Sequence, residues 1–176
     1  GKFKDKPRIY AIAVDIVLLS DGKLEEEVIL TFLENYQAET PLTIGELWAA
    51  PFMMRIALIN KIREVAEKVE KCQNHIKKAR LWSEKFINAI EESDNTLNKA
   101  INEHDKAINI IESAYGEHIL HFMREYGTDA IPVIKWFDKR LALQGTNADK
   151  IIHDEHQNQT SLQIFTGNLI TSMRFL

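Results

Sequence analysis

The densest group of chemically capable side chains lies late in the sequence, at residues 153–156, which read His-Asp-Glu-His. Imidazoles and carboxylates bind metal ions, and residues three apart on a helix share a face, so His153 and His156 could both reach one ion. The spacing differs from that of zinc hydrolases, where two histidines four apart flank a glutamate. A third ligand would have to come from another segment, such as His118 or His121. We therefore expect a polar helix surface, or a hydrogen-bonded polar seam, without a metal ion.

Two other reactive side chains, His104 and Cys72, occupy apolar positions of helical patterns. A lone histidine at such a position is typical of a half-buried core residue, and we expect His104 to hydrogen-bond across a helical hairpin. Cys72 is interpreted as a small hydrophobic residue because the nearby His75 falls on a different helix face and cannot activate the thiol.

The sequence shows no catalytic constellation. Its carboxylates fall into i,i+4 charge pairs of a solvated helix face, namely Glu64 with Lys68 and Glu67 with Lys71. A glycine-rich phosphate loop, a Gly-x-Ser-x-Gly elbow and an Asp-x-Asp motif are all missing from the sequence. We predict no catalytic, cofactor-binding or metal-binding residue and no cofactor.

The composition favours helices. Hydrophobic residues make up 45% and charged residues 27% of 176 residues, and only seven glycines and four prolines are available for turns. The net charge of -4 argues against nucleic acid as a partner. A single cysteine excludes an internal disulfide and a multi-cysteine zinc site, and it fits a reducing compartment.

The apolar runs are too short to cross a membrane. Residues 9–19 are interrupted by Asp15 and residues 49–59 by Arg55, whereas a span needs about 20 apolar residues. A signal peptide is not recognisable either. We expect the piece to be soluble. A locally basic stretch is interpreted as a solvated face, with contact to a membrane surface as the alternative; it comprises Lys68, Lys71, Lys77, Lys78, Arg80 and Lys85.

Punctuating residues predict the helices of the first third of the chain. One helix should start at Pro7 and stop at residues 20–22, which read Ser-Asp-Gly, and a second should run over about 24–37. Thr43 and Glu46 form a capping box for a third helix, in which Pro51 predicts a break or a kink.

The clearest periodicity follows. Apolar residues alternate in steps of three and four at Ile62, Val65, Val69, Cys72, Ile76, Ala79, Ser83, Phe86 and Ile90, and again at Leu97, Ile101, His104, Ile108, Ile111 and Tyr115. Ser93 or Asp94 is a ready N-cap between the two series. The pattern predicts an antiparallel hairpin over about 55–115.

Further helices are expected over about 119–126, from Thr128 or Asp129 to Gly145, and from a cap at Thr146 to the end of the sequence. The fold class is therefore all-α, a multi-helix bundle with a long antiparallel heptad hairpin. We expect residues 1–176 to form a single helical domain. Because both ends are abrupt, we also expect it to be a fragment of a larger protein.

Several segments carry a family resemblance. They are residues 7–13 (PRIYAIA), 20–24 (SDGKL), 40–51 (TPLTIGELWAAP), 54–55 (MR), 57–59 (ALI), 155–157 (EHQ) and 167–174 (GNLITSMR). In this order they resemble the region near the N-terminus of bacterial cyclic β-1,2-glucan synthases. The hairpin between Cys72 and Tyr115 is not part of the resemblance.

The resemblance implies a very large, multi-pass inner-membrane parent enzyme. In that family a glycosyltransferase domain uses UDP-glucose to make the glucan, and a phosphorylase-like module acts on its length. The resemblance places this region on the cytoplasmic side, ahead of the membrane spans. The signatures of both catalytic modules are missing from this sequence, so no catalytic residue is carried over: the parent is implied to be an enzyme, and this piece is not.

Three hypotheses follow. The first is a non-catalytic helical scaffold or interaction domain of such a synthase, with the remaining domains of the parent as partners. The second is a free-standing helical protein-interaction module that uses the hairpin to grip another helix, self-association included. The third is an enzyme-class metal site around His153 and His156.

Overall fold

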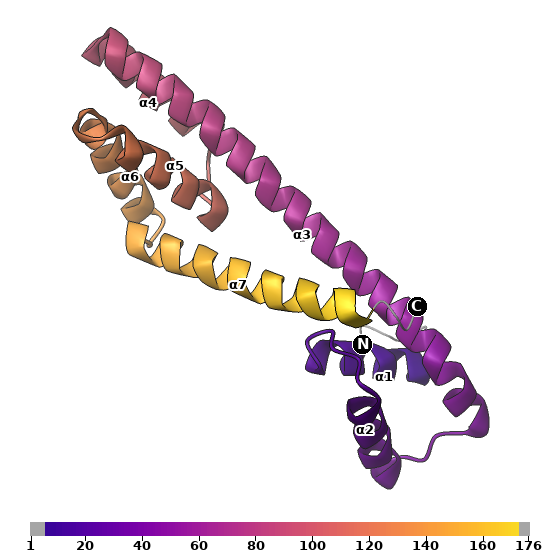
Figure 1. The fold of residues 1–176 in the computed structure, drawn as a ribbon. Coiled ribbons are helices and arrows are strands. Elements are labelled where there is room, and N and C mark those ends of the chain that lie inside the picture. Colours follow the sequence, from indigo (N-terminus) through magenta and orange to yellow (C-terminus); the bar gives the residue numbers. More distant parts are fainter. Residues whose placement is uncertain (1–5, 173–176) are drawn as a thin grey trace. The chain divides into compact units, whose positions relative to one another are not determined.

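The computed structural model describes residues 6–172, and every regular element in that range is a helix (Figure 1). The elements are α1 (Arg8–Leu19), α2 (Glu26–Glu39), α3 (Ile44–Glu92), α4 (Asp94–Ala107), α5 (Ser113–Tyr126), the 3-10 helix η1 (Thr128–Ala130), α6 (Ile131–Leu143) and α7 (Ala148–Ser172). The predicted all-α fold is confirmed. The predicted continuation of the last helix beyond Ser172 lies outside the described residues.

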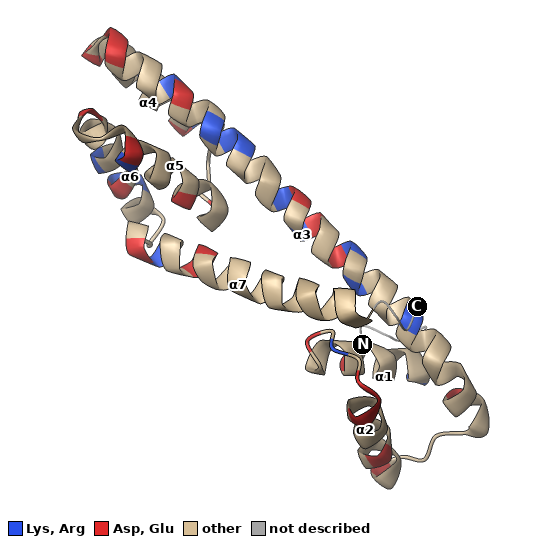
Figure 2. Cartoon of the chain, in the orientation of Figure 1, with Lys and Arg blue, Asp and Glu red and all other residues tan. Residues whose placement is uncertain are grey.

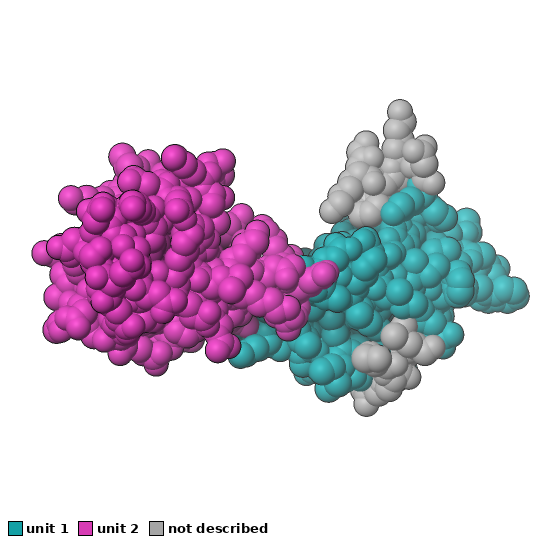
Figure 3. Space-filling view, turned by 90° about the horizontal axis from the view of Figure 1, so that it is seen from above, with its two compact units in different colours: residues 1–67, 160–176 teal, residues 68–159 magenta. Residues whose placement is uncertain are grey.

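The chain divides into two compact units (Figure 3). Unit 1 comprises residues 1–67 and 160–176, and unit 2 comprises residues 68–159. Helices α3 and α7 contribute residues to both units. The expectation of a single domain over residues 1–176, with its hairpin arm, stays a prediction.

Unit 1 is built around the apolar face predicted for the first helix. Ile9, Ile12 and Ile16 of α1 are buried with Leu58 of α3 and Leu169 of α7 in one hydrophobic cluster. The i,i+3 and i,i+4 spacing of the isoleucines places them on one side of α1, which explains their common burial.

The turn after α1 is fixed by the end of α7. Gly22 adopts a φ of +77°, and a Cβ atom there would lie 3.1 Å from Cζ of Phe165. The Ser172 hydroxyl donates to the Gly22 carbonyl at 2.7 Å and accepts from the Leu24 amide at 2.8 Å. Glycine is thus required by both the backbone angle and the close approach of α7.

The predicted capping box at the start of α3 is present. The Glu46 carboxylate accepts from the Thr43 amide at 2.8 Å, and the Glu46 amide donates to the Thr43 hydroxyl at 3.3 Å. Arg8 of α1 donates to the same carboxylate at 2.6 Å. These donors, Arg8 first, lower the pKa of Glu46 to about 2. The break predicted at Pro51 does not occur: α3 is one helix from Ile44 to Glu92 with the proline inside it. Ala50 before the proline and Met53 after it pack in the hydrophobic cluster of unit 1.

Unit 2 contains the tip of the hairpin. The Ser93 hydroxyl accepts from the Thr96 amide at 3.3 Å, as an N-cap of α4 should. Phe86 of α3 and Leu97 of α4 are buried in one cluster with side chains of α5, α6 and α7. Near the tip, the seam therefore packs against further helices of its own unit.

Three boundaries in unit 2 differ from those predicted. Helix α4 ends at Ala107, because the backbone is extended at Ile108, so the second arm does not reach Tyr115. Tyr115 belongs instead to α5, which begins at Ser113. The start of α7 is capped by Asn147, whose side-chain oxygen accepts from the Lys150 amide at 2.8 Å, and not by Thr146.

Candidate functional site

Glu155 of α7 is a buried carboxylate inside unit 2. Its side chain is 4% exposed. It accepts hydrogen bonds from the Ser113 hydroxyl at 3.1 Å and from the Gln159 amide at 3.1 Å, and the Cys72 sulfur lies 3.9 Å away. All three of these partners are neutral. They supply the hydrogen bonds that a buried carboxylate needs.

The contact with Glu155 also determines the state of Cys72. Burial raises the pKa of the Cys72 thiol, and the negative charge of Glu155 raises it further. A thiol shifted in this direction stays protonated at neutral pH and is a poor nucleophile. Cys72 thus acts as a weak donor in a structural contact.

The loop between α4 and α5, residues 108–112, is held by two side chains of α6 and the turn that follows it. Arg140 donates to the carbonyls of Ile108 at 3.2 Å and Asn109 at 3.0 Å. Gln144 accepts from the Ile111 amide at 2.8 Å and donates to the Ile111 carbonyl at 3.3 Å. Backbone groups of Ile108, Asn109 and Ile111 therefore have the partners that a helix or strand would otherwise provide.

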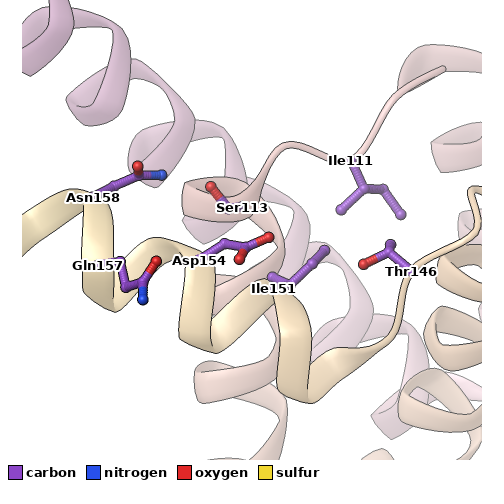
Figure 4. A pocket seen from close by; sticks show the side chains of 7 residues that line it. All are labelled: Ile111, Ser113, Thr146, Ile151, Asp154, Gln157 and Asn158. Atoms are coloured by element: carbon purple, nitrogen blue, oxygen red, sulfur yellow. The ribbon is translucent and has the colours of Figure 1, made fainter.

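Beside this loop lies a hollow of about 420 Å³ (Figure 4). Its lining comes from the α4–α5 loop, the start of α5, the segment before α7 and the first half of α7, and consists of Ile111, Ser113, Thr146, Ile151, Asp154, Gln157 and Asn158. Ser113 connects the hollow to the buried carboxylate, since its hydroxyl is bonded to Glu155. The lining offers hydroxyls, amides and one carboxylate around two isoleucine side chains.

His104 is a core residue. It is 0% exposed, and its Nε2 atom lies 2.7 Å from the Tyr115 hydroxyl. Trp82 and Trp136 stand edge-on to the imidazole, each with a centroid distance of 4.9 Å. The hydrogen bond reaches α5, not the opposite arm of the hairpin as predicted. Burial lowers the pKa of His104 to about 4, so the ring is neutral at physiological pH.

The histidines that could have formed a metal site are dispersed. His153 and His156 are both exposed on α7. His118 pairs with Glu117 at 2.6 Å, and His121 lies 3.4 Å from Glu125. Within residues 6–172, no three His, Cys, Asp or Glu side chains are arranged to share a metal ion. That these residues hold no metal stays a prediction.

Basic and acidic residues both occur along α3 (Figure 2), and the pairs that they form differ from the two predicted. Lys61 pairs with Glu64 at 3.1 Å, and Arg63 with Glu67 at 2.6 Å, so each glutamate contacts the basic residue before it in the sequence. A basic residue of the stretch 68–85, Lys71, reaches Glu112 in the α4–α5 loop at 3.3 Å.

Other basic residues of that stretch also have acidic partners. Arg80 pairs with Glu84 at 3.2 Å, and Lys85 pairs with Glu103 of α4. Exposed pairs of this kind contribute little to stability but reduce the positive field of the helix.

The roles of Gln144 and Arg140 could not be predicted, because side chains that bind a loop backbone follow no spacing rule. Glu155 could have been found. Glu155 follows the apolar Ile151 by four residues, which places it on the same side of α7, and both are buried.

A second surface feature belongs to unit 1. Four large apolar side chains of α3 are well exposed, with relative exposures of 71% for Ile44, 83% for Trp48, 60% for Phe52 and 55% for Ile59. The spacing of four, four and seven residues places them along one side of the helix. Contiguous exposed apolar side chains of this kind mark interaction surfaces.

In the part of the chain that the structure describes, none of the helices combines the length and the apolar character that crossing a bilayer requires.

Comparison with known proteins relates this sequence to a glucan synthase. No protein-family model matches the chain. Its sequence is 27% identical over 169 residues to a protein named cyclic beta-(1,2)-glucan synthase NdvB of Rhizobium meliloti (strain 1021). The alignment covers 96% of this chain but 6% of that protein, so the chain spans a small part of the length of its relative. The predicted resemblance to cyclic β-1,2-glucan synthases is confirmed.

Proposed function

We propose that this chain is a non-catalytic helical scaffold and interaction domain of a cyclic β-1,2-glucan synthase. The parent would be a membrane-bound glucosyltransferase that uses UDP-glucose, with this domain on the cytoplasmic side. The observation that carries the proposal is the alignment with a glucan synthase along 96% of the chain. The partners of the domain would be the remaining domains of that synthase.

The state of the reactive side chains supports a structural role. His104 is enclosed by aromatic rings, Glu155 is bonded to neutral donors, and the thiol of Cys72 has a raised pKa. Groups held in this way contribute to packing and to hydrogen-bond satisfaction. A catalytic base or nucleophile, in contrast, needs an accessible and activated atom.

The exposed side of α3 in unit 1 supports the interaction role. Between Glu46 and Glu64 the helix has three basic residues, Arg55, Lys61 and Arg63, and no acidic one. Trp48 and Phe52 are the types of residue that concentrate binding energy in protein interfaces. We assign this side of α3 as the surface that contacts the rest of the synthase.

A chimera tests the proposal. The segment of the Rhizobium meliloti synthase that aligns with this chain is replaced by residues 1–176, and cyclic β-1,2-glucan is measured in cell extracts. We expect glucan to be made. A second chimera carries Phe86→Asp, which places a charge in the core of unit 2. We expect this chimera to make no glucan and to be present in cells in much lower amounts, because the domain no longer folds. A chimera with native amounts of protein and no glucan would contradict the proposal.

The interaction surface is tested by binding. The purified chain is mixed with the relative's synthase lacking the aligned segment, and capture is quantified. Trp48→Ala with Phe52→Ala should weaken capture at least tenfold without changing the melting temperature, since both side chains are exposed. Leu143→Ala, on an 82%-exposed side chain of unit 2, is the matched control. Capture that withstands the double substitution would exclude this surface.

The alternative, a free-standing helical interaction module, rests on the same exposed side chains. It predicts that the chain binds other proteins, or itself, and does not bind the truncated synthase. The capture experiment therefore separates the two functions.

A further inference from the structure

We propose that the hollow between the α4–α5 loop and α7 binds an uncharged saccharide. The choice of a β-1,2-linked glucose unit as its ligand rests on the proposed function. The saccharide class itself rests on the lining, which combines one carboxylate, two amides and two hydroxyls with two isoleucine side chains (Figure 4).

The polar groups of the lining match the hydroxyls of a sugar. The Asp154 carboxylate accepts hydrogen bonds, and the Asn158 side chain both donates and accepts. Asp154 and Asn158 are four residues apart on α7 and therefore share one side of the helix. Neighbouring ring hydroxyls, each a donor and an acceptor, can bind such a pair together.

Anionic ligands do not fit this site. The seven lining residues include no lysine or arginine, and Asp154 adds a negative charge. A phosphate or a nucleotide would be repelled by Asp154 and would find no basic side chain in the lining to pair with. The site therefore selects against the phosphorylated forms of a sugar.

A divalent cation fits less well than a sugar. Calcium takes six to eight oxygen ligands with more than one carboxylate among them. Asp154 is the one carboxylate in the lining, and the oxygens of Glu155 are bonded to Ser113 and Gln159. The charge available to neutralise the ion is therefore too small.

Two isoleucine side chains form the floor of the hollow beneath its polar groups. Ile111 and Ile151 are both buried, at 4% exposure each, and both approach Gly116 of α5. A Cβ atom at position 116 would lie 3.0 Å from Ile111 and 3.2 Å from Ile151. Glycine at this position lets the two isoleucines come close to α5 and sets the depth of the floor.

The frame of the hollow is fixed before a ligand arrives. The Gln144 side chain forms hydrogen bonds with the amide and the carbonyl of Ile111, and the buried Glu155 carboxylate accepts one from the Ser113 hydroxyl. A site whose side chains are already ordered loses less entropy when it binds a ligand.

The test is a titration of the full chain with the β-1,2-linked glucose disaccharide, followed by the amide resonances of the protein. The lining contains no aromatic side chain to stack on the sugar, so we expect weak binding, with a Kd of about 1 mM. The shifts should concentrate at Ser113, Thr146, Asp154 and Asn158. Equal shifts with the open-chain polyol sorbitol, which has no ring face, would overturn the proposal.

Variants locate the site. Asp154→Ala removes the carboxylate from a half-buried helical position and should weaken binding by more than about tenfold while the protein stays folded. Asp138→Ala removes an exposed carboxylate from α6 of the same unit and should leave the Kd unchanged. Unchanged binding by the Asp154 variant, or a response to Ca²⁺ alone, would overturn the assignment.

The outcomes distinguish this inference from the proposed function. If the chimeric synthase makes glucan but the disaccharide shifts no resonance, the saccharide site is wrong and the scaffold role stands. If the disaccharide and cellobiose bind equally while the chimera makes no glucan, the saccharide site stands without the synthase.

Discussion

At the scale of single residues, the protonation state of His104 in unit 2 is set by its burial. His104 has one nitrogen against the Tyr115 hydroxyl, while its Nδ1 atom is buried without a hydrogen-bond partner in the structure. A neutral imidazole tolerates this position, whereas an imidazolium would have to give up its hydration. The aromatic rings around it therefore fix its protonation state along with its place.

We predict that acid destabilises the chain through His104. The ordinary pKa is 6.5 and the folded value is about 4, so the unfolded chain binds the proton more tightly. The stabilisation is complete above pH 6.5, is lost as the pH falls below 6.5, and is gone below about pH 4. It amounts to about 3 kcal/mol.

Urea unfolding at several pH values measures this effect. In His104→Leu, the free energy of unfolding should fall less between pH 6.5 and 4 than in the wild type. The control His153→Leu, at an exposed position, should show the same fall as the wild type. Parallel curves for the wild type and the His104 variant would refute the assignment.

At the scale of elements, short connections are held by side chains from neighbouring helices. The α4–α5 loop depends on Arg140 and Gln144, and the α1–α2 turn depends on Ser172. A loop fixed in this way behaves as part of the helical frame, because its backbone groups are bonded inside the protein.

Gln144→Ala should loosen the α4–α5 loop. It removes both bonds to Ile111 and leaves a buried amide and carbonyl unpaired, which costs about 1–3 kcal/mol. Hydrogen exchange at residues 108–112 should accelerate more than exchange in α6. Gln157→Ala, at an exposed position, serves as the control. Unchanged exchange in the loop would show that Arg140 alone holds it.

The hairpin yields a second prediction at this scale. Ile101 is half-buried against the core of unit 2. Ile101→Asp would place a charge without a partner there and should lower stability by several kcal/mol, about 3 or more. The neighbouring Asn102→Asp, which is exposed, should change it little. If Ile101→Asp instead spares the melting temperature and abolishes self-association in sedimentation, the seam is open and receives a second copy.

Local signals predicted much of this architecture. Pro7, the box of Thr43 with Glu46, and Ser93 mark helix starts in the structure, because capping depends on residues close in sequence. The end of α4 was not predictable in the same way. The heptad pattern continues through Ile108 and Ile111, so it predicts more helix there. In the structure the backbone of these two residues is instead hydrogen-bonded to the side chains of Arg140 and Gln144, which lie over 30 positions away in the sequence. The hollow escaped prediction because its lining comes from residues that are up to 47 positions apart, Ile111 to Asn158, in the α4–α5 loop, α5, the segment before α7 and α7 itself.

At the scale of the whole molecule, the sequence joins its helices without a glycine-rich phosphate loop or an Asp-x-Asp motif. We predict that the purified chain neither hydrolyses UDP-glucose nor binds it with micromolar affinity, because a diphosphate is usually held by backbone amides of such a loop and by a metal ion on carboxylates. Calorimetric titration with UDP-glucose and Mg²⁺ tests this. A micromolar Kd would identify the chain as a part of the donor site.

The bonds of Ser172 to the α1–α2 turn have a consequence for the order in which the protein is made. Unit 1 draws on residues 1–67 and 160–176, so Gly22 and Leu24 leave the ribosome about 150 positions before the serine that binds them. Unit 2 is continuous in sequence and can close its core as soon as residue 159 emerges. We infer that unit 2 folds first and that the N-terminal helices wait, with the apolar face of α1 uncovered on one side, until the last turn of α7 arrives.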